Sequence, residues 1–346
     1  ASLACFIAVG DSTARAATIT VSATDCQRLV QHQPAADVAY TPGVDVNGTL
    51  SLLHHALTLS GSLDLTNGTM TSTGTITFDG TGSDPVLSPN QNTLSGITIA
   101  GGTVTLSGAL ALGGDLTVSA GTLALGTNAL TLSGSLATSG TITTSGLITF
   151  DGTSSKTIQS SGTAFSGVTF ASAGTWTLSD AMRVTGDLRL TDGTVNASKI
   201  NAEGNVTQSS TFDGGSTSLT INGSGNQTLT GGGSTSAGDL PPLTIAKSAG
   251  TLTLGSIIRT TNNWTHTGGT ISAGSSTGAL AGTLTFESGK QTFGNVHVVA
   301  GTATLSGALA LSGSVKIDNG ATRAVSASSH AITLSGGWLN AGTLTK

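Results

Sequence analysis

Residues 97–128 read ITIAGGTVTLSGALALGGDLTVSAGTLALGTN, and this stretch decides the fold. In each short run, Ile, Val or Leu alternates with Thr, Ser or Ala, which is the two-residue period of a β-strand. Each run ends at Gly, Asn or Asp, residues that adopt turn conformations at little cost. Because no stretch has helical periodicity, the sequence predicts an all-β fold of short strands joined by tight turns.

One block recurs along the chain and consists of Gly-Thr-x-Thr-Leu, an apolar stretch, a polar position and a second strand. The clear copies begin at Thr103, Thr175, Thr251 and Thr302. The polar position lies 12 residues later, at Asp115, Asp187, Asn263 and Ser314. A small residue lies 19 residues after the start, at Thr122, Thr194, Thr270 and Ala321. A fifth copy begins at Thr49, with one extra residue before Ser62, and such self-similarity is typical of repeat architectures.

A second motif, Thr-Phe-Asp-Gly, precedes most copies of the block. It occupies residues 77–80, 149–152 and 211–214, and a degenerate form, Thr-Phe-Glu-Ser, occupies residues 285–288. The distance between motif and block varies, and residues 231–242 have the composition of an inserted loop. Constant strand blocks separated by variable segments are expected when insertions lie on the loops of a repeat scaffold.

Three short strands with their turns total about 19 to 22 residues, which is one turn of a parallel β-helix. A sandwich would lack the 19-residue repeat, and a propeller would need blades of roughly 40–45 residues. A narrow interior filled by Leu, Ile, Val and Ala also explains an aromatic content of only 3%. We therefore predict a β-solenoid over residues 48–346, with roughly a dozen turns at about 22 residues each.

The repeats also carry a family resemblance. Residues 226–229 (NQTL), 243–245 (LTI), 250–254 (GTLTL) and 263–265 (NWT) follow one another in order. Together with the Phe-Asp-Gly motifs, this text resembles the Phe-Asp-Gly/Gln-Thr repeats of large bacterial surface proteins and adhesins. The resemblance covers residues 48–346 and implies an exported, cell-surface β-helix. It carries over no catalytic residue, because that family shares none.

Residues 1–47 take no part in the repeats and are predicted to form an N-terminal cap or arm. The apolar start ASLACFIAV and the small-x-small pattern Ala14-Arg15-Ala16 leave two interpretations of residues 1–16 open. They are either the remnant of a signal peptide or a packed part of the mature chain. Cys5 and Cys26 are the two cysteines of the chain, and the sequence leaves open whether they form a disulfide in an oxidising compartment.

The composition argues against several classes of function. Charged residues make up 8% of the chain, and a formal net charge of -5 with scattered Lys and Arg gives no basic surface for nucleic acid. No run approaches the ~20 apolar residues of a membrane span. No Cys/His cluster has the spacing of zinc ligands. The Gly-rich segments lack the Lys and the following helix of a phosphate-binding loop.

The recurring acids of the second motif are the first candidates for a metal site: Asp79, Asp151, Asp213 and Glu287. Calcium takes six or more oxygen ligands, whereas each copy of the motif supplies one acid flanked by Gly, Thr and Ser. A role in turn formation is the simpler interpretation. His54 and His55 are expected to point to opposite faces of a strand, which argues against a shared metal.

One region is dense in charge and contains Asp180, Arg183, Asp187, Arg189 and Asp192. Glycoside hydrolysis needs two carboxylates about 5–10 Å apart, and β-helix enzymes that cleave acidic polysaccharides need acids and bases on one face. No His or nucleophile accompanies this group. We therefore interpret it as a solvated ion-pair surface, and the protein as a non-enzyme without a cofactor.

Thr-x-Thr pairs recur and could form a flat rank of side chains that binds ice. They lie at Thr75/Thr77, Thr103/Thr105, Thr141/Thr143, Thr175/Thr177, Thr251/Thr253, Thr283/Thr285 and Thr302/Thr304. The pairs do not occur once per turn, so the preference of Thr for strands is the simpler explanation. Trp176, Trp264 and Trp338 are interpreted as filling wider parts of the core or capping it.

The resulting hypothesis is structural: a secreted, rigid β-solenoid subunit of a bacterial surface filament, sheath or adhesin stalk. We expect end-to-end assembly into a homopolymer, with surface glycans as a further partner and with neither nucleic acid nor a membrane span. The alternative is a carbohydrate- or ice-binding module. The expected subunit contacts lie towards the two ends of the chain, at Ala1, Phe6, Ile7, Tyr40, Trp338 and Leu344.

Overall fold

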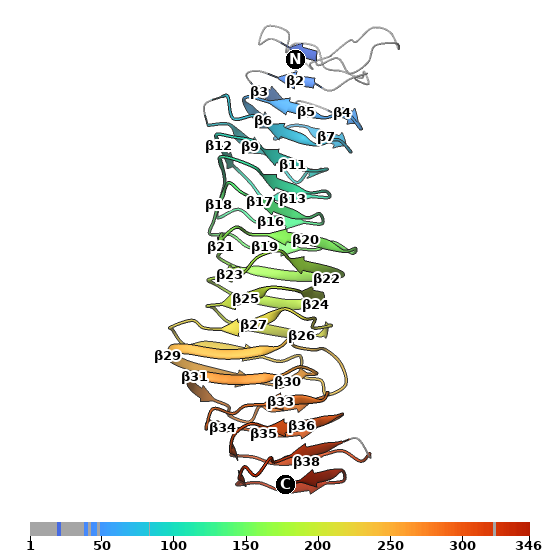
Figure 1. Ribbon diagram of the computed structural model, residues 1–346. Coiled ribbons are helices and arrows are strands. Elements are labelled where there is room, and N and C mark those ends of the chain that lie inside the picture. Colours follow the sequence, from blue (N-terminus) through green and yellow to red (C-terminus); the bar gives the residue numbers. More distant parts are fainter. Residues whose placement is uncertain (1–18, 22–37, 41–42, 47–48, 83, 321–322) are drawn as a thin grey trace. The chain divides into compact units, whose positions relative to one another are not determined.

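The computed structural model describes residues 19–21, 38–40, 43–46, 49–82, 84–320 and 323–346. Within these ranges the chain is all-β without a helix, and its parallel strands stack as a β-solenoid, which is the fold that the sequence predicts (Figure 1). The solenoid has about 16 turns, more than the dozen expected from the sequence. The chain divides into two compact units. The first is Ala1–Gly152 with Lys156–Ala164, and the second is Thr153–Ser155 with Phe165–Lys346.

The described strands of the first unit form three ladders, and most turns contribute one strand to each. The first ladder is β1 (Ile19–Val21), β2 (Val38–Tyr40), β5 (Leu57–Leu59), β8 (Ile76–Phe78), β11 (Ile97–Ile99), β14 (Leu116–Val118), β17 (Leu136–Thr138) and β20 (Lys156–Gln159). The second ladder is β3 (Gly43–Asp45), β6 (Ser62–Asp64), β9 (Val86–Ser88), β12 (Thr103–Leu106), β15 (Thr122–Gly126) and β18 (Thr141–Thr144). The third comprises the pair β4 (Thr49–Leu53) and β7 (Thr69–Ser72), and the run β10 (Thr93–Leu94), β13 (Leu110–Leu112), β16 (Leu130–Leu132) and β19 (Ile148–Phe150).

The 19-residue spacing of the repeated block is one turn of the solenoid. Thr103 pairs with Thr122, and in the second unit Thr175 pairs with Thr194 and Thr251 with Thr270. In the fourth copy, Thr302 pairs with Ala324, so that turn is longer, and Ala321 lies outside the described residues. Turns shorter than the 22 residues assumed above explain why the solenoid has about 16 of them.

A glycine opens the strand at this position because the chain turns a tight corner there. Gly121 has a φ of +70°, a left-handed conformation that L side chains rarely adopt. A Cβ atom on Gly121 would also lie 2.2 Å from the carbonyl oxygen of Gly102 in the preceding turn. The recurring Gly-Thr dipeptide is therefore dictated by the corner.

The core of the first unit consists of columns of identical or similar side chains. Ile76, Ile97, Leu116 and Leu136 pair in register along the first ladder, and each is at most 1% exposed. Burying one such side chain contributes about 1.5–3 kcal/mol, so each column is a large source of stability. Thr117, between two inward residues, points outward and is half-exposed, as the two-residue period requires.

The second unit has longer strands that turn corners without interruption. Its longest ladder is β22 (Val168–Leu178), β24 (Leu188–Asn196), β26 (Val206–Phe212), β28 (Gln227–Thr230), β29 (Leu243–Gly255), β31 (Trp264–Ser272), β33 (Leu284–Phe286), β36 (Thr302–Leu305), β39 (Ala324–Ser326) and β42 (Thr343–Thr345). Another ladder joins β29 to β23 (Met182–Val184), β25 (Lys199–Ala202) and β27 (Ser218–Ile221). A third ladder is β30 (Ile257–Thr260), β32 (Thr277–Leu280), β35 (Asn295–Val298), β38 (Val315–Ile317) and β41 (Trp338–Asn340). A fourth is β34 (Thr292–Phe293), β37 (Leu309–Leu311) and β40 (Ile332–Leu334). Strand β21 (Ala164–Phe165) lies where the two units meet in the sequence.

Aromatic side chains fill the interior of the second unit. Trp176 and Trp264 are at most 1% exposed, as predicted for residues that fill the core. The ring of Trp264 lies 5.8 Å from those of Phe286 and Phe293, in tilted and edge-on arrangements. Trp338 differs, because 37% of its surface is exposed.

Two long polar side chains are also buried in the second unit. Nζ of Lys247, 3% exposed, donates to the carbonyl oxygens of Gly223 at 2.6 Å and Gly225 at 2.8 Å, and to Oε1 of Gln227 at 2.5 Å. Gln227, the Gln of the Gln-Thr motif, in turn donates to the carbonyl oxygen of Ala202. Burial lowers the pKa of Lys247. Each of the three N–H groups of its ammonium has a neutral oxygen as acceptor, and this fits a structural role for the side chain.

Much of the N-terminal segment lies outside the described residues. Ala1, Phe6 and Ile7, the interpretations of residues 1–16, and the Cys5–Cys26 pair all fall there. The strands described within residues 1–47 belong to the solenoid: β1 pairs with β2, β2 with β5, and β3 with β6. The ladders therefore begin before residue 48.

Candidate functional site

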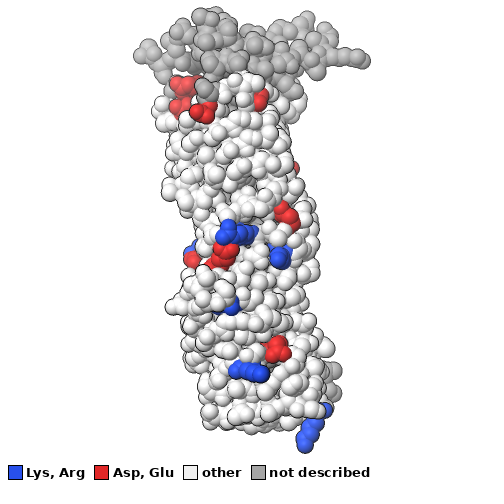
Figure 2. All heavy atoms as spheres, turned by 60° about the vertical axis from the view of Figure 1, so that its left-hand side comes forward, with Lys and Arg blue, Asp and Glu red and all other residues white. Residues whose placement is uncertain are grey.

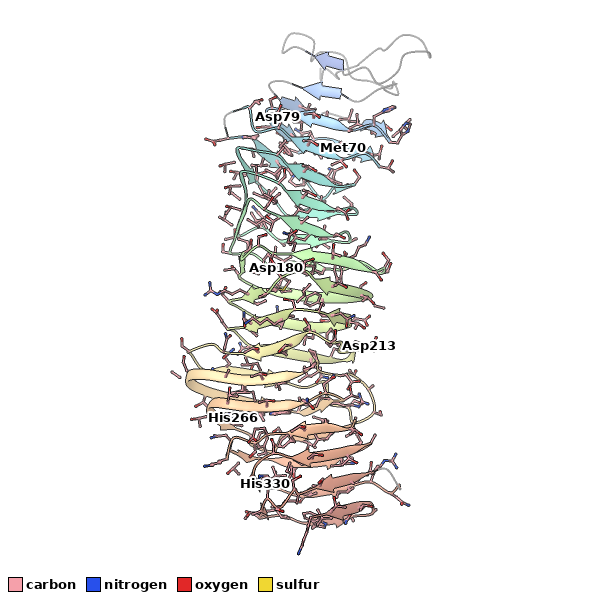
Figure 3. All side chains as sticks on the ribbon, viewed as in Figure 1. Met70, Asp79, Asp180, Asp213, His266 and His330 are labelled. Atoms are coloured by element: carbon pink, nitrogen blue, oxygen red, sulfur yellow. The ribbon has the colours of Figure 1, made fainter. Side chains whose placement is uncertain are left out.

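Two acids of the Phe-Asp-Gly motif, Asp79 and Asp151, hold turns together. Asp79 follows β8 (Figure 3), and its carboxylate accepts hydrogen bonds from Oγ of Ser60 at 2.7 Å and from the backbone N–H of Thr81 at 2.9 Å. Burial raises the pKa of Asp79, but these bonds and one from the Thr81 hydroxyl outweigh it, so the pKa lies below its usual value. Asp151 likewise accepts from Oγ of Ser133 at 2.7 Å. Each acid thus ties its turn to the preceding one.

Glu287 makes the same kind of contact in the degenerate motif. It accepts from Oγ of Ser306 at 2.6 Å and from the backbone N–H of Gly289 at 2.8 Å. Among the described residues, no group of three or more His, Cys, Asp or Glu side chains could hold a metal ion. The hydrogen bonds of Asp79, Asp151 and Glu287 fit the interpretation of these three acids as turn formers.

Asp213 lies in a different environment, beside the predicted inserted loop. It forms a parallel bridge with Asp239, and Oδ1 of Asp239 lies 2.6 Å from Nη1 of Arg259. Burial raises the pKa of Asp239, with the neighbouring charge of Asp213 adding to this and Arg259 opposing it. Arg259 also donates to the carbonyl oxygens of Thr235 at 3.1 Å and Gly238 at 3.0 Å, so it fastens the loop to the solenoid.

The charge-dense region of the sequence is an exposed set of pairs. Arg183 binds Glu203, with Nε 2.6 Å from Oε1, and Arg189 binds Asp187 at 3.0 Å. Glu203 was missed by the sequence analysis because it lies one turn further along the chain. Figure 2 shows how few charged side chains interrupt the face drawn there.

His54 and His55 do not lie in a strand. They follow β4, and their ring centroids are 4.2 Å apart, so the prediction that they point to opposite faces is wrong. The alternation rule fails because the backbone has already turned: Leu53 has a φ of +53°.

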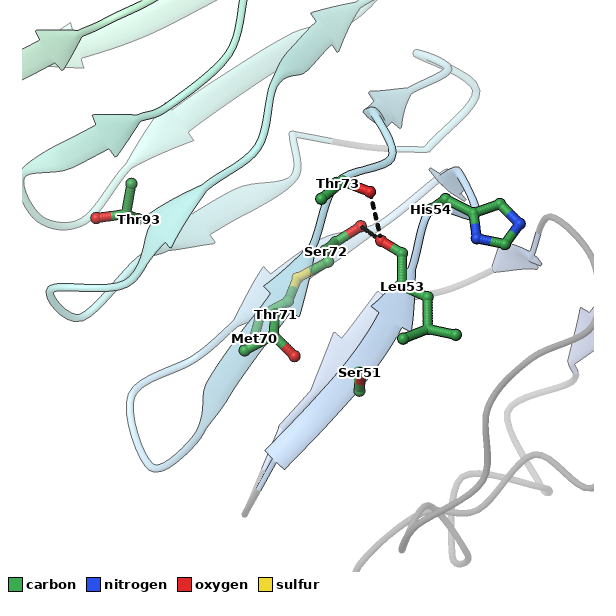
Figure 4. Close-up of a pocket in the computed structure, with 8 residues that line it drawn as sticks. All are labelled: Ser51, Leu53, His54, Met70, Thr71, Ser72, Thr73 and Thr93. Carbon is green, nitrogen blue, oxygen red and sulfur yellow. Dashed lines mark hydrogen bonds between the residues drawn. The ribbon is translucent and has the colours of Figure 1, made fainter.

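A groove of about 580 Å³ lies on the outer surface at this turn (Figure 4). Its lining residues are Ser51, Leu53, His54, Met70, Thr71, Ser72, Thr73 and Thr93. The pairing of β4 with β7 shifts register between Ser51 and Leu53, as at a β-bulge. The carbonyl oxygen of Leu53 accepts from Oγ1 of Thr73 at 3.0 Å, which fixes the wall of the groove.

Two columns of outward side chains form a regular surface on the second ladder. Thr103, Thr122 and Thr141 stack in register in one column. Thr105, Ala124 and Thr143 stack in the next. Neighbouring strands lie about 4.8 Å apart and alternate residues roughly 6.7 Å apart, so the hydroxyls form a two-dimensional array.

The last three strands pair on one side within the described chain. β40, β41 and β42 pair with β37, β38 and β39 respectively. Trp338 continues the inward column of Val315, and Leu344 that of Val325, yet these two side chains are 37% and 45% exposed. Among the described residues, this set of strands therefore presents exposed apolar side chains.

Comparison with known proteins gave no relative: no protein-family model, no curated protein and no solved structure matches the chain. In the part of the chain that the structure describes, no helix is long and apolar enough to cross a membrane. The functional proposal therefore rests on the sequence and the geometry of this chain.

Proposed function

We propose that this chain is a structural protein, a rigid β-solenoid module displayed outside a bacterial cell in a filament, sheath or adhesin stalk. The observation that carries the proposal is that recurring polar side chains make hydrogen bonds within the solenoid itself. Asp79, Asp151 and Glu287 tie adjacent turns together, and the buried Lys247 is bonded to neutral acceptors. The resemblance to bacterial surface repeats supports export.

Assembly would use the edge formed by β40, β41 and β42. Exposed strand edges pair with further strands. Covering apolar side chains such as Trp338 and Leu344 with a further turn removes them from water and stabilises the assembly. We propose that a second copy supplies this turn, through its N-terminal segment. Negative-stain electron microscopy across a range of concentrations tests this: filaments of constant subunit spacing support it, and isolated particles at every concentration contradict it.

A deletion separates assembly from folding. Removing residues 1–18, which precede β1, should abolish filaments while the circular dichroism spectrum stays that of a β-protein. A matched control replaces Thr117, which lies on the outer surface away from the edge, with Ala and should leave filaments intact. Normal assembly of the deletion variant would contradict the role of the N-terminal segment.

The Thr array on the second ladder favours one other function, the binding of ice. A flat set of regularly spaced hydroxyl and methyl groups can order water in two dimensions, and three of the six positions are exposed: Thr105, Thr141 and Thr143. Thermal hysteresis of the purified chain tests this function. Replacing Thr105 with Lys should abolish any hysteresis, and the same replacement of Thr117 on the first ladder should preserve it.

A further inference from the structure

The groove beside β4 and β7 is not explained by the needs of the solenoid. Leu53 holds a left-handed φ of +53°, which is unfavourable for a branched side chain, and its side chain is 37% exposed. Other outward positions of the third ladder, such as Ser51, Thr71 and Ala111, carry small or hydroxyl side chains. A bulge re-aims the side chain that follows it, and here it presents an apolar group beside hydroxyl side chains of the groove.

The hydroxyls across the groove are free to bind a ligand. Oγ of Ser51, Oγ1 of Thr71 and Oγ1 of Thr93 have no hydrogen-bond partner among the described residues, whereas Thr73 is already bonded to Leu53. A hydroxyl both donates and accepts, so a row of them matches the hydroxyls of a sugar. Met70, 5% exposed, closes the floor with an apolar surface.

The charges around the groove indicate what charge its ligand carries. Between residues 38 and 155 there is no Lys or Arg, and there are six Asp. An anionic ligand would meet an unfavourable field there, and the groove offers no carboxylate to a cation. These surroundings therefore favour a neutral ligand.

We propose that the groove formed by Ser51, Leu53, His54, Thr71 and Thr93 binds a neutral oligosaccharide. Leu53 contacts the C–H face of a sugar ring, and the free hydroxyls bond to its polar edge. The volume of about 580 Å³ lies within the ~300–1,000 Å³ typical of ligand sites. This binding activity goes beyond the structural function and does not depend on assembly, because the groove lies on the outer surface and not at the edge formed by β40–β42.

Saturation-transfer NMR and calorimetry on the full chain test the proposal with three probes. Cellotetraose and N-acetylchitotetraose are neutral, and tetragalacturonate is anionic. We expect saturable binding of at least one neutral probe at ~1 mM or tighter, as for a shallow site, and weaker or no binding of the anionic one. Failure of both neutral probes to bind at ~10 mM, or tighter binding of tetragalacturonate, would overturn the proposal.

Variants locate the binding at the groove. Thr71→Val keeps the shape and removes one hydroxyl, and it should weaken binding about three- to tenfold. Leu53→Gly should weaken binding without lowering the melting temperature, because Gly adopts the positive φ freely. Thr117→Val, the matched control on the first ladder, should leave the dissociation constant unchanged. Equal weakening by Thr71→Val and Thr117→Val would place the binding elsewhere and contradict the proposal.

Discussion

Oδ1 of Asp115 accepts a hydrogen bond of 2.7 Å from the backbone N–H of Ser135, one turn further along the solenoid. Asp115 is the polar position of the repeated block, 12 residues after Thr103. In the third copy, Oδ1 of Asn263 accepts in the same way from the N–H of Thr285, at 2.8 Å. In these two copies the polar position therefore caps a backbone donor of the next turn, whereas Asp187 in the second copy accepts from the side-chain amide of Asn205.

Replacing Asp115 with Ala should lower the free energy of unfolding by about 0.5–1.5 kcal/mol, because the N–H of Ser135 loses its acceptor. Asp115→Asn retains an oxygen at this position and should stay within ~0.5 kcal/mol of the parent protein. Urea denaturation of the three proteins measures both differences. Equal losses in the two variants would show that charge, not capping, is what the position supplies.

The sequence predicts the architecture well because a solenoid is built from local rules repeated many times. The spacing from Thr103 to Thr122 is one turn, and the alternation around Leu116 defines its inner and outer faces. The same spacing locates the polar position at Asp115 but does not show which backbone group this residue caps. Its hydrogen-bond partner, Ser135, belongs to a turn whose register only the structure shows.

The groove could not be predicted because it arises from an exception to the repeat. A φ of +53° at Leu53 accompanies a register shift between two turns, and no residue type in the sequence signals it. The single extra residue in the copy that begins at Thr49 is the one available sign of irregularity there. This extra residue places the irregularity in the correct turn but does not predict that a groove forms there.

The inward columns should be far more sensitive to truncation than the outward ones. Leu116 is fully buried, so Leu116→Ala should cost about 2–5 kcal/mol through lost burial and the cavity left behind. Its neighbour Thr117 points outward, and Thr117→Ala should change stability by less than ~0.5 kcal/mol. Thermal unfolding followed by circular dichroism measures both. Similar losses in the two variants would contradict the assignment of inner and outer faces.

Glu287 should make stability depend on pH below its usual pKa. The hydroxyl of Ser306 and the N–H of Gly289 hold the pKa of Glu287 below the ordinary value of 4.5. A carboxylate with a lowered folded-state pKa contributes stability above 4.5 that is lost as the pH falls through the folded-state value. The melting temperature should therefore fall less steeply on acidification in Glu287→Gln than in the parent protein.

A matched control is Asp187→Asn, since the two contacts of this carboxylate, an ion pair with Arg189 and a hydrogen bond from Nδ2 of Asn205, both lie at the exposed surface. This variant should follow the parent protein between pH 6 and about pH 3, because exposed pairs contribute little. Parallel curves for the parent protein and Glu287→Gln over the same range would contradict the proposed contribution of Glu287.

Arg259 should be important for the local stability of the inserted loop. Its side chain is 16% exposed, pairs with Asp239, and donates to the carbonyl oxygens of Thr235 and Gly238. Arg259→Met removes these donors and leaves Asp239, whose pKa burial already raises, without its counter-charge. We expect a loss of about 3–5 kcal/mol, since breaking a partly buried pair leaves an uncompensated charge.

The loop of residues 231–239 should then open before the solenoid does, because Arg259 is its anchor to β30. Limited proteolysis should cut Arg259→Met within this loop at protease concentrations that leave the parent protein intact. The control is Arg189→Met, whose pair with Asp187 is 47% and 44% exposed and should contribute at most ~1 kcal/mol. Cleavage of both variants at the same rate would mean that the loop is held by other contacts, and that Arg259 acts no differently from a surface ion pair.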